Sequence, residues 1–129
     1  GPLPGTADAR PGAAGRARRA GARPRSGAVS YVYLWRFVVR PGSEAEFEAA
    51  YGQDGAWVRL FRKADGYLDT KLLRDQAAPG TYVTIDRWAS RAAWEAFRAA
   101  WAVEWEAIDN RCQALTEREE EIGRFEELP

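Results

Sequence analysis

The stretch from Thr81 to Leu115 constrains the fold of this chain more than any other. Residues 81–88 are rich in β-branched and aromatic side chains and predict a strand. Ser90 then offers an N-cap hydroxyl, and a helical pattern follows with no Gly or Pro before Gly123. Large apolar residues at steps of three or four share one face of this helix: Trp94, Phe97, Trp101, Trp105, Ile108, Cys112 and Leu115. A stripe of this kind needs a broad, flat partner, and a β-sheet is the natural one.

Three further segments predict the other strands of that sheet. Residues 31–39 are apolar on both faces apart from Arg36, which is typical of a central strand or of one that faces a partner subunit. Residues 67–74 predict a strand that a turn joins to residues 81–88 as a hairpin. The polar segment 121–128 predicts a short edge strand, since charged side chains suit an edge.

A first helix is predicted between the first two strands. Ser43 and Glu46 fit a capping box at its start. Gly52 and Gly55 predict a break, which lets the backbone bend and leaves room for a cavity beside Trp57. The element order is therefore β-α-β-β-α-β. It predicts an α+β, ferredoxin-like fold with a four-stranded antiparallel sheet and two helices on one face.

This plan leaves one face of the sheet uncovered. Side chains alternate along the first strand, so Tyr31, Tyr33, Trp35 and Phe37 lie on one side, and Val32, Leu34 and Val38 on the other. One set meets the helices, and the other would be an exposed apolar patch in a monomer. We therefore predict a homodimer that packs sheet to sheet.

Charge and composition divide the chain into two parts. Of the first 28 residues, 24 are Ala, Gly, Arg or Pro, which predicts a disordered tail over residues 1–28 and one domain over residues 29–129. The tail holds six arginines and one aspartate, whereas the rest holds 13 basic and 18 acidic residues. An arginine arm for nucleic acid is the alternative reading of the tail. No aromatic residue is interleaved with these arginines and the domain is acidic, so we expect no nucleic-acid partner.

The rarest residue types exclude several classes of chemistry. The chain has no histidine, which excludes Ser-His-Asp and Cys-His mechanisms. Its one cysteine, Cys112, fits the apolar stripe as a core residue, and no thiolate cluster exists to hold a metal or iron–sulfur centre. With no Gly-rich nucleotide motif either, we expect no cofactor. No apolar run is long enough for a membrane span and no secretory signal is evident, so we expect a cytoplasmic protein with no membrane partner.

Residues 82–97 carry a resemblance to a known family. They read Tyr-Val-Thr-Ile-Asp-Arg-Trp-Ala-Ser-Arg-Ala-Ala-Trp-Glu-Ala-Phe. The family shows a strand with an acidic residue two before a Trp, then a Ser and an amphipathic helix, and the matching residues are Asp86, Trp88, Ser90 and Phe97. Gly66-Tyr67 also fits a recurrent Gly-Tyr or Gly-Phe at the start of the second strand. Over residues 31–115 the chain resembles the antibiotic biosynthesis monooxygenase family of dimeric α/β-barrel proteins.

The resemblance implies a range of functions. Some members oxidise polyaromatic substrates with molecular oxygen and without metal or flavin, others bind and degrade haem, and many have no known activity. Members often carry a His near the position of Trp101, and its absence here disfavours haem degradation. We expect a cofactor-independent monooxygenase that acts on a polycyclic aromatic or phenolic small molecule. The alternative is a non-catalytic dimeric module of the same fold that binds a small molecule or only packs against its own copy.

An oxygenase without a cofactor needs a base, a cation and a desolvated slot. Asp86 and Tyr67 are the candidate proton-handling residues, and Arg36 is the candidate cation. The candidate substrate-binding residues are Trp57, Trp101 and Phe61. Structural alternatives remain open, since Arg36 and Asp86 fit an ion pair across the sheet and the aromatic residues fit ordinary core packing. Further polar candidates, which the sequence does not distinguish, are Gln53, Thr84 and Asn110.

Overall fold

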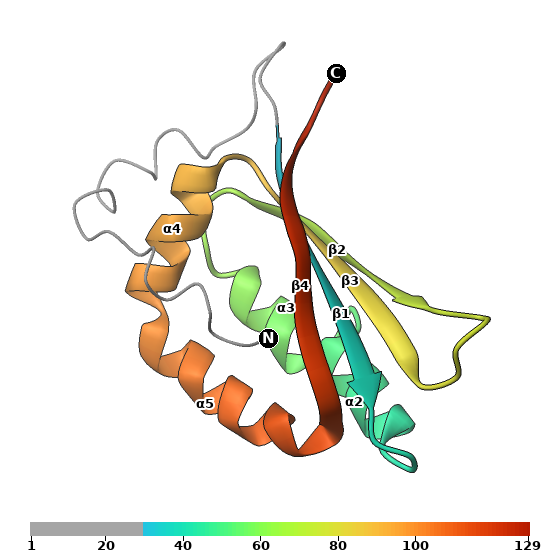
Figure 1. Cartoon of the computed structure of the whole chain (residues 1–129). Helices are drawn as coiled ribbons and strands as arrows, with labels where there is room; N and C mark the ends of the chain where they lie inside the picture. Colours follow the sequence, from blue (N-terminus) through green and yellow to red (C-terminus); the bar gives the residue numbers. More distant parts are fainter. Residues whose placement is uncertain (1–29) are drawn as a thin grey trace.

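The computed structural model describes residues 30–129 and contains a four-stranded antiparallel sheet with the order β2-β3-β1-β4 (Figure 1). The disorder predicted for residues 1–28 lies outside the described residues. The predicted ferredoxin-like fold is confirmed. The strands are β1 (Ser30–Val39), β2 (Tyr67–Arg74), β3 (Thr81–Trp88) and β4 (Thr116–Glu127).

Strand β1 lies at the centre of the sheet, between β3 and β4. Its burial alternates strictly, because successive side chains of a strand point to opposite faces. The face turned toward the helices carries the buried side chains Tyr31, Tyr33, Trp35, Phe37 and Val39. The aromatic set of β1 therefore forms the floor of the core.

Four α-helices and a short 3₁₀ helix lie on the same side of the sheet (Figure 1). They are α2 (Glu44–Tyr51), α3 (Ala56–Phe61), α4 (Arg91–Ala100), α5 (Ala102–Cys112) and η3 (Gln113–Leu115). Among residues 30–129, no helix is both long and apolar enough to cross a membrane.

The break between α2 and α3 occurs at the two predicted glycines. Gly55 is buried, and a Cβ atom there would lie 2.2 Å from the backbone oxygen of Ala50. Only glycine allows this close approach of the chain to the end of α2. The break turns α3 so that Trp57 and Phe61 point into the core.

The capping box predicted for Ser43 and Glu46 is wrong. Ser43 has φ −104° and ψ 8°, not the extended backbone of an N-cap, and its hydroxyl makes no capping bond. Its backbone oxygen accepts from Phe47 N at 2.9 Å. The turn is held instead by the Glu44 carboxylate, which accepts from Gly42 N at 2.9 Å.

The helix predicted to run on from Ser90 is in fact two helices, although its predicted cap is confirmed. Ser90 Oγ accepts from Ala93 N at 3.0 Å. At Trp101 the backbone leaves helical geometry, with φ −115° and ψ 30°, and α5 starts in a new direction. The single apolar stripe therefore ends at Trp101, which stays half-buried and lies 5.4 Å from Lys63 Nζ. The turn brings Trp105 to 4.8 Å from Trp57, ring centre to ring centre.

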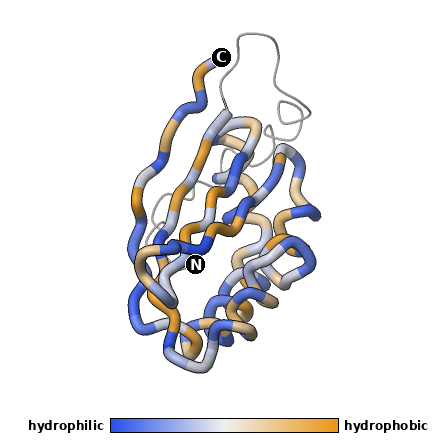
Figure 2. The backbone as a smooth tube through the Cα atoms, turned by 90° about the vertical axis from the view of Figure 1, so that its right-hand side faces the viewer, coloured by the Kyte–Doolittle hydropathy of each residue, from blue (hydrophilic) through white to orange (hydrophobic). Residues whose placement is uncertain are grey.

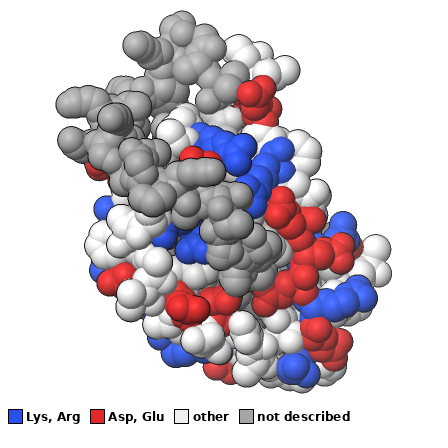
Figure 3. Space-filling view, turned by 60° about the vertical axis from the view of Figure 1, so that its left-hand side comes forward, with Lys and Arg blue, Asp and Glu red and all other residues white. Residues whose placement is uncertain are grey.

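Strand β4 is longer than the predicted segment 121–128. It pairs with β1 along its whole length, from Ser30 opposite Glu127 to Val39 opposite Thr116. Backbone hydrogen bonds to β1 hold it, so its side chains can stay polar. Acidic and basic side chains mix along β4, and Figure 3 shows such charges interspersed on one face of the molecule.

The face of the sheet away from the helices remains partly exposed and apolar at its centre. It includes Val32, Leu34, Val38, Val83 and Ile85, none of which is fully buried, together with the exposed Leu73 and Phe125. Figure 2 shows hydrophobic segments along the strands. Ion pairs border this surface, among them Arg87 with Asp69 at 2.6 Å and with Glu127 at 2.8 Å. We call this surface the outer sheet face.

Candidate functional site

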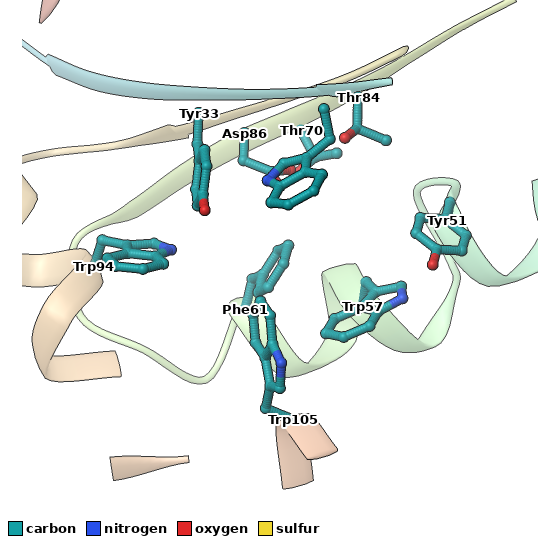
Figure 4. A pocket seen from close by; sticks show the side chains of 10 residues that line it. Tyr33, Tyr51, Trp57, Phe61, Thr70, Thr84, Asp86, Trp94 and Trp105 are labelled. Carbon is teal, nitrogen blue, oxygen red and sulfur yellow. The ribbon is translucent and has the colours of Figure 1, made fainter. Parts of the chain in front are cut away.

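A narrow cavity of about 30 Å³ lies between the inner face of the sheet and helices α2, α3, α4 and α5 (Figure 4). A space of this size holds only one or two water molecules, so the rings around it must move apart to admit a ligand. The residues that line it are Tyr33, Trp35, Tyr51, Trp57, Phe61, Thr70, Thr84, Asp86, Trp94 and Trp105. Polar groups come mainly from the sheet and aromatic rings mainly from the helices, so the two sides of the cavity differ in chemistry.

The strand register explains the polar side. Asp86 on β3 stands opposite Thr70 on β2 and opposite Tyr33 on β1, so all three point to the helix side. The Tyr67 hydroxyl donates to Thr70 Oγ1 at 2.8 Å, and Thr70 Oγ1 donates to Asp86 Oδ1 at 2.7 Å. Thr84, two residues before Asp86, lines the same side. A chain of hydrogen bonds therefore leads from Tyr67 to the cavity carboxylate.

Burial sets the acidity of this chain. Desolvation raises the pKa of Asp86 to about 6, against a smaller opposing effect of the Thr70 hydrogen bond. Desolvation also raises the pKa of Tyr67 to about 12, so its phenol keeps its proton at neutral pH. Asp86 is thus a carboxylate poised to exchange a proton near neutrality, with a neutral donor behind it.

The aromatic side is built by four helices. Tyr51 comes from α2, Trp57 and Phe61 from α3, Trp94 from α4 and Trp105 from α5. Trp57 is only 3% exposed, and its ring meets that of Trp105 edge to face. Figure 4 shows the rings of Phe61, Trp57 and Trp105 across the space from Tyr33 and Asp86. This geometry suits a flat apolar ligand that carries a polar group toward the sheet.

A cation on β4, Arg124, lies near this region, although it was not among the residues predicted for the site from the sequence. Arg124 stands opposite Tyr33 in the β1–β4 register. Its Nη2 donates to the Tyr33 hydroxyl at 3.1 Å, and the guanidinium lies 4.7 Å from the Tyr33 ring centre and 5.2 Å from that of Trp94. Since both rings line the cavity, Arg124 places positive charge beside it. The proximity of Arg124 to the cavity follows from the length and register of β4, which the sequence alone does not show.

The ion pair predicted between Arg36 and Asp86 is wrong. Arg36 stands opposite Val83 and Glu120, and Asp86 stands opposite Tyr33. Arg36 therefore points to the outer sheet face, on the other side of the sheet from the cavity. Its Nε lies 3.9 Å from Glu120 Oε2.

The other sequence candidates divide between cavity and surroundings. Trp57, Phe61, Asp86 and Thr84 line the cavity, whereas Trp101 does not. Tyr67 reaches it through Thr70, and Gln53 Nε2 donates to the backbone oxygen of Thr70 at 2.6 Å. Asn110 is exposed on α5. The lining residues that the sequence candidates did not include are Tyr33, Trp35, Tyr51, Thr70, Trp94 and Trp105.

Comparison with known proteins identifies the class to which this fold and cavity belong. Residues 30–104 match the family described as antibiotic biosynthesis monooxygenase, and the chain belongs to that family. The curated proteins contain no match to the chain.

Solved structures agree with this assignment. SnoaB, a cofactor-independent oxygenase from Streptomyces nogalater, is 28% identical, with a TM-score of 0.58 over 76% of this chain and 92% of that chain. A putative antibiotic biosynthesis monooxygenase from Bordetella bronchiseptica is 22% identical, with a TM-score of 0.64 over 81% of this chain and 100% of that chain. A conserved protein from Methanosarcina mazei is 11% identical, with a TM-score of 0.60 over 77% and 93%. The last two share the fold.

Proposed function

We propose that this protein is a cofactor-independent monooxygenase that acts on a polycyclic aromatic or phenolic small molecule. The observation that carries the proposal is the Asp86 carboxylate, with a pKa of about 6, at the polar side of an aromatic cavity. A carboxyl group with this pKa is mostly ionised at pH 7 and is more basic than an ordinary carboxylate, so it suits a general base. Membership of the family and the similarity to SnoaB support the same activity.

In the proposed reaction the substrate itself supplies the electrons. Asp86 accepts the proton of an acidic ring hydroxyl or of an activated CH₂ group, which leaves a ring anion. The anion passes an electron to O₂, and the two radicals combine to form a carbon–oxygen bond. Loss of water then converts the CH₂ carbon to C=O, with one oxygen atom retained and the other released in the water. The four electrons that reduce O₂ all come from that carbon.

The neighbouring residues take roles that follow from their contacts. Tyr67 and Thr70 form the hydrogen-bond chain that returns a proton to or from Asp86. Arg124 places a positive charge beside the cavity, the role that the sequence analysis gave to Arg36. The rings of Trp57 and Trp105 hold the flat substrate and exclude water, which strengthens the electrostatic interactions of the ring anion. Because Asp86 must be ionised to act, kcat/KM is expected to rise with pH through about 6 and then level off.

Oxygen uptake tests this proposal. Purified protein is mixed with anthrone-like phenols after exhaustive dialysis against a chelator, and O₂ consumption is followed with an electrode. Wild type should consume O₂, and Asp86→Asn should be slower by about 100-fold or more. The exposed Asp54→Asn is the control and should keep the wild-type rate. A full rate in a well-folded Asp86→Asn protein would remove Asp86 as the base. Tight binding of the phenols without O₂ uptake would favour the non-catalytic binding module instead.

We also propose that the outer sheet face joins two copies in a homodimer. Its central residues Val32, Leu34, Val83 and Ile85 are apolar but only partly covered, and the helices lie on the other side. Burial of this patch against its own copy removes it from water. The cytoplasmic location inferred from the sequence stays a prediction.

A further inference from the structure

Tyr33 carries a hydroxyl group at the cavity to which the proposed reaction assigns no role. Its side chain lies on the inner face of β1, is only 4% exposed and lines the cavity. Figure 4 shows the hydroxyl directed away from the sheet, toward the space that Trp94 and Phe61 border. Tyr33 therefore presents a polar group to a ligand that enters between these rings.

Arg124 uses the acceptor side of this hydroxyl. Its Nη2 donates to the Tyr33 hydroxyl oxygen at 3.1 Å, and its Nε donates to Glu121 Oε2 at 3.2 Å, so two polar contacts hold the guanidinium in place. A tyrosine hydroxyl can accept one hydrogen bond and donate another. Among residues 30–129, no group accepts the Tyr33 proton. Because the cation polarises the O–H bond, this unused proton is a stronger donor than that of an isolated phenol.

The Tyr33 donor is available at the pH at which Asp86 acts as a base. Desolvation raises the pKa of Tyr33 to about 12, although the charge of Arg124 acts in the opposite direction. The phenol therefore keeps its proton at pH 7, where Asp86 is mostly ionised. The cavity thus holds a base and a neutral donor at the same time.

The strand register places this donor beside the base. Tyr33 on β1 stands directly opposite Asp86 on β3, and both side chains line the cavity. Side chains opposed in this way have Cβ atoms about 5 Å apart. One ligand oxygen can therefore lie within reach of both groups, so that Asp86 takes its proton and Tyr33 donates to the oxyanion left behind. Asp86 becomes neutral in this step, and the negative charge moves to the side of Tyr33 and Arg124.

We propose that Tyr33, with Arg124 behind it, forms an oxyanion site and that the ligand of the cavity is a phenol or enol bound there as its anion. This inference rests on the proposed function, because it specifies the substrate class of the same cavity and adds a catalytic residue to the same reaction. A donor already oriented toward the developing charge stabilises the anion without the reorganisation that water requires. A ring without an ionisable oxygen leaves the Tyr33 proton without an acceptor and should bind less tightly.

The test compares 4-nitrophenol with 4-nitrotoluene, in which a methyl group of similar size replaces the ionisable hydroxyl. A single ring requires the least displacement of the aromatic residues around the narrow cavity. Affinities are measured at pH 6 by quenching of tryptophan fluorescence, without turnover. Wild type should bind 4-nitrophenol about 10-fold or more tightly than 4-nitrotoluene, and the bound ligand should absorb as the phenolate. Tyr33→Phe should lose most of this preference, with an unchanged affinity for 4-nitrotoluene.

Two further variants separate this role from a structural one. Tyr31→Phe is the matched control, since Tyr31 is buried on the same face of β1 and is not among the residues that line the cavity. It should keep the wild-type preference. Arg124→Met should weaken the binding of 4-nitrophenol by less in the Tyr33→Phe background than in wild type, because Arg124 acts through the hydroxyl. Loss of affinity for both ligands in Tyr33→Phe, together with a lower melting temperature, would mean that the hydroxyl only supports the fold and would overturn the oxyanion site.

The outcomes distinguish the inference from the proposed function. Equal binding of the two ligands to wild type, binding of neither, or an unchanged preference in Tyr33→Phe would each overturn the oxyanion site. O₂ uptake by wild type together with an unchanged preference in Tyr33→Phe would leave the oxygenase in place and remove the site. A preference for 4-nitrophenol that is lost in Tyr33→Phe, without O₂ uptake by wild type from any phenol, would support the site and contradict the oxygenase.

Discussion

Replacement of Asp86 by Asn should change how the stability of the protein depends on pH. Burial raises the pKa of this carboxyl from 3.8 to about 6, a difference of about 2 pH units. Each unit corresponds to about 1.4 kcal/mol of differential interaction between the two protonation states. The ionised carboxylate therefore costs the folded protein about 3 kcal/mol relative to the neutral acid, a large fraction of the stability of a small domain.

The sign of the effect follows from proton binding. Between the ordinary pKa and the raised one, the folded protein holds a proton on Asp86 that the unfolded chain has released. The free energy of unfolding that Asp86 contributes is therefore highest below pH 4, falls as pH rises toward 6, and is constant above that range. The amide of the Asp86→Asn variant cannot titrate, so this variant should lack the decline. Burial also raises the pKa values of Asp109 and Glu119, but their contributions are common to both proteins and cancel in the comparison.

Urea unfolding followed by tryptophan fluorescence gives the measurement. Wild type and Asp86→Asn are unfolded at pH 4, 5, 6, 7 and 8, with the exposed Asp54→Asn as the control. The drop in unfolding free energy from pH 4 to pH 8 should be smaller in Asp86→Asn by about 2.5 kcal/mol, because part of the effect already lies below pH 4, and it should be unchanged in Asp54→Asn. Parallel curves for wild type and Asp86→Asn would show that Asp86 is not desolvated. The raised pKa, which is the physical reason for assigning Asp86 as a base, would then be absent.

Three further expectations are accessible to standard assays. Sedimentation of the wild-type protein should give a mass near twice 14.4 kDa. Leu34→Arg on the outer sheet face should give a monomer, whereas the control Val103→Arg, at a site on α5 that is 78% exposed, should remain a dimer. A soluble wild-type monomer would contradict the proposed dimer. Gly55→Ala should lower the free energy of unfolding by about 2 kcal/mol or more and the melting temperature by about 10 °C, because the new Cβ meets the Ala50 backbone oxygen at 2.2 Å. An unchanged melting temperature would mean that the backbone between α2 and α3 shifts to accept the new methyl group. Trp57→Phe should raise KM with little change in kcat, since stacking on the ring acts on bound substrate and transition state alike; a selective loss of kcat would instead give Trp57 a part in the chemistry.

Local chemistry was enough to predict the elements that surround the cavity. The bounds of β2 and β3 follow from β-branched and aromatic runs that end at turn residues. Gly52 and Gly55 mark the break between α2 and α3, and Ser90 marks the start of α4. Each of these signals acts within a few residues of the chain, so the sequence shows it directly.

Contacts between segments that are distant along the chain could not be predicted from the sequence, because they depend on how those segments pair and pack. The sequence shows that Tyr33 and Trp35 share one face of β1. Which face of β1 meets the helices depends, however, on how the helices pack. The turn at Trp101 has no Gly or Pro to announce it, and it decides that Trp105 rather than Trp101 reaches Trp57.

The sequence by itself determined the four strands, their order along the chain, the resemblance to the family and the aromatic character of the core. The tertiary structure decided which polar groups share the cavity. Thr70 meets Asp86 through the β2–β3 register, and Arg124 reaches Tyr33 through the β1–β4 register, 91 residues apart along the chain. A shift of one residue in either register would turn these side chains to the opposite face of the sheet. Register is set by the joint packing of the whole sheet, and no local stretch of sequence contains it.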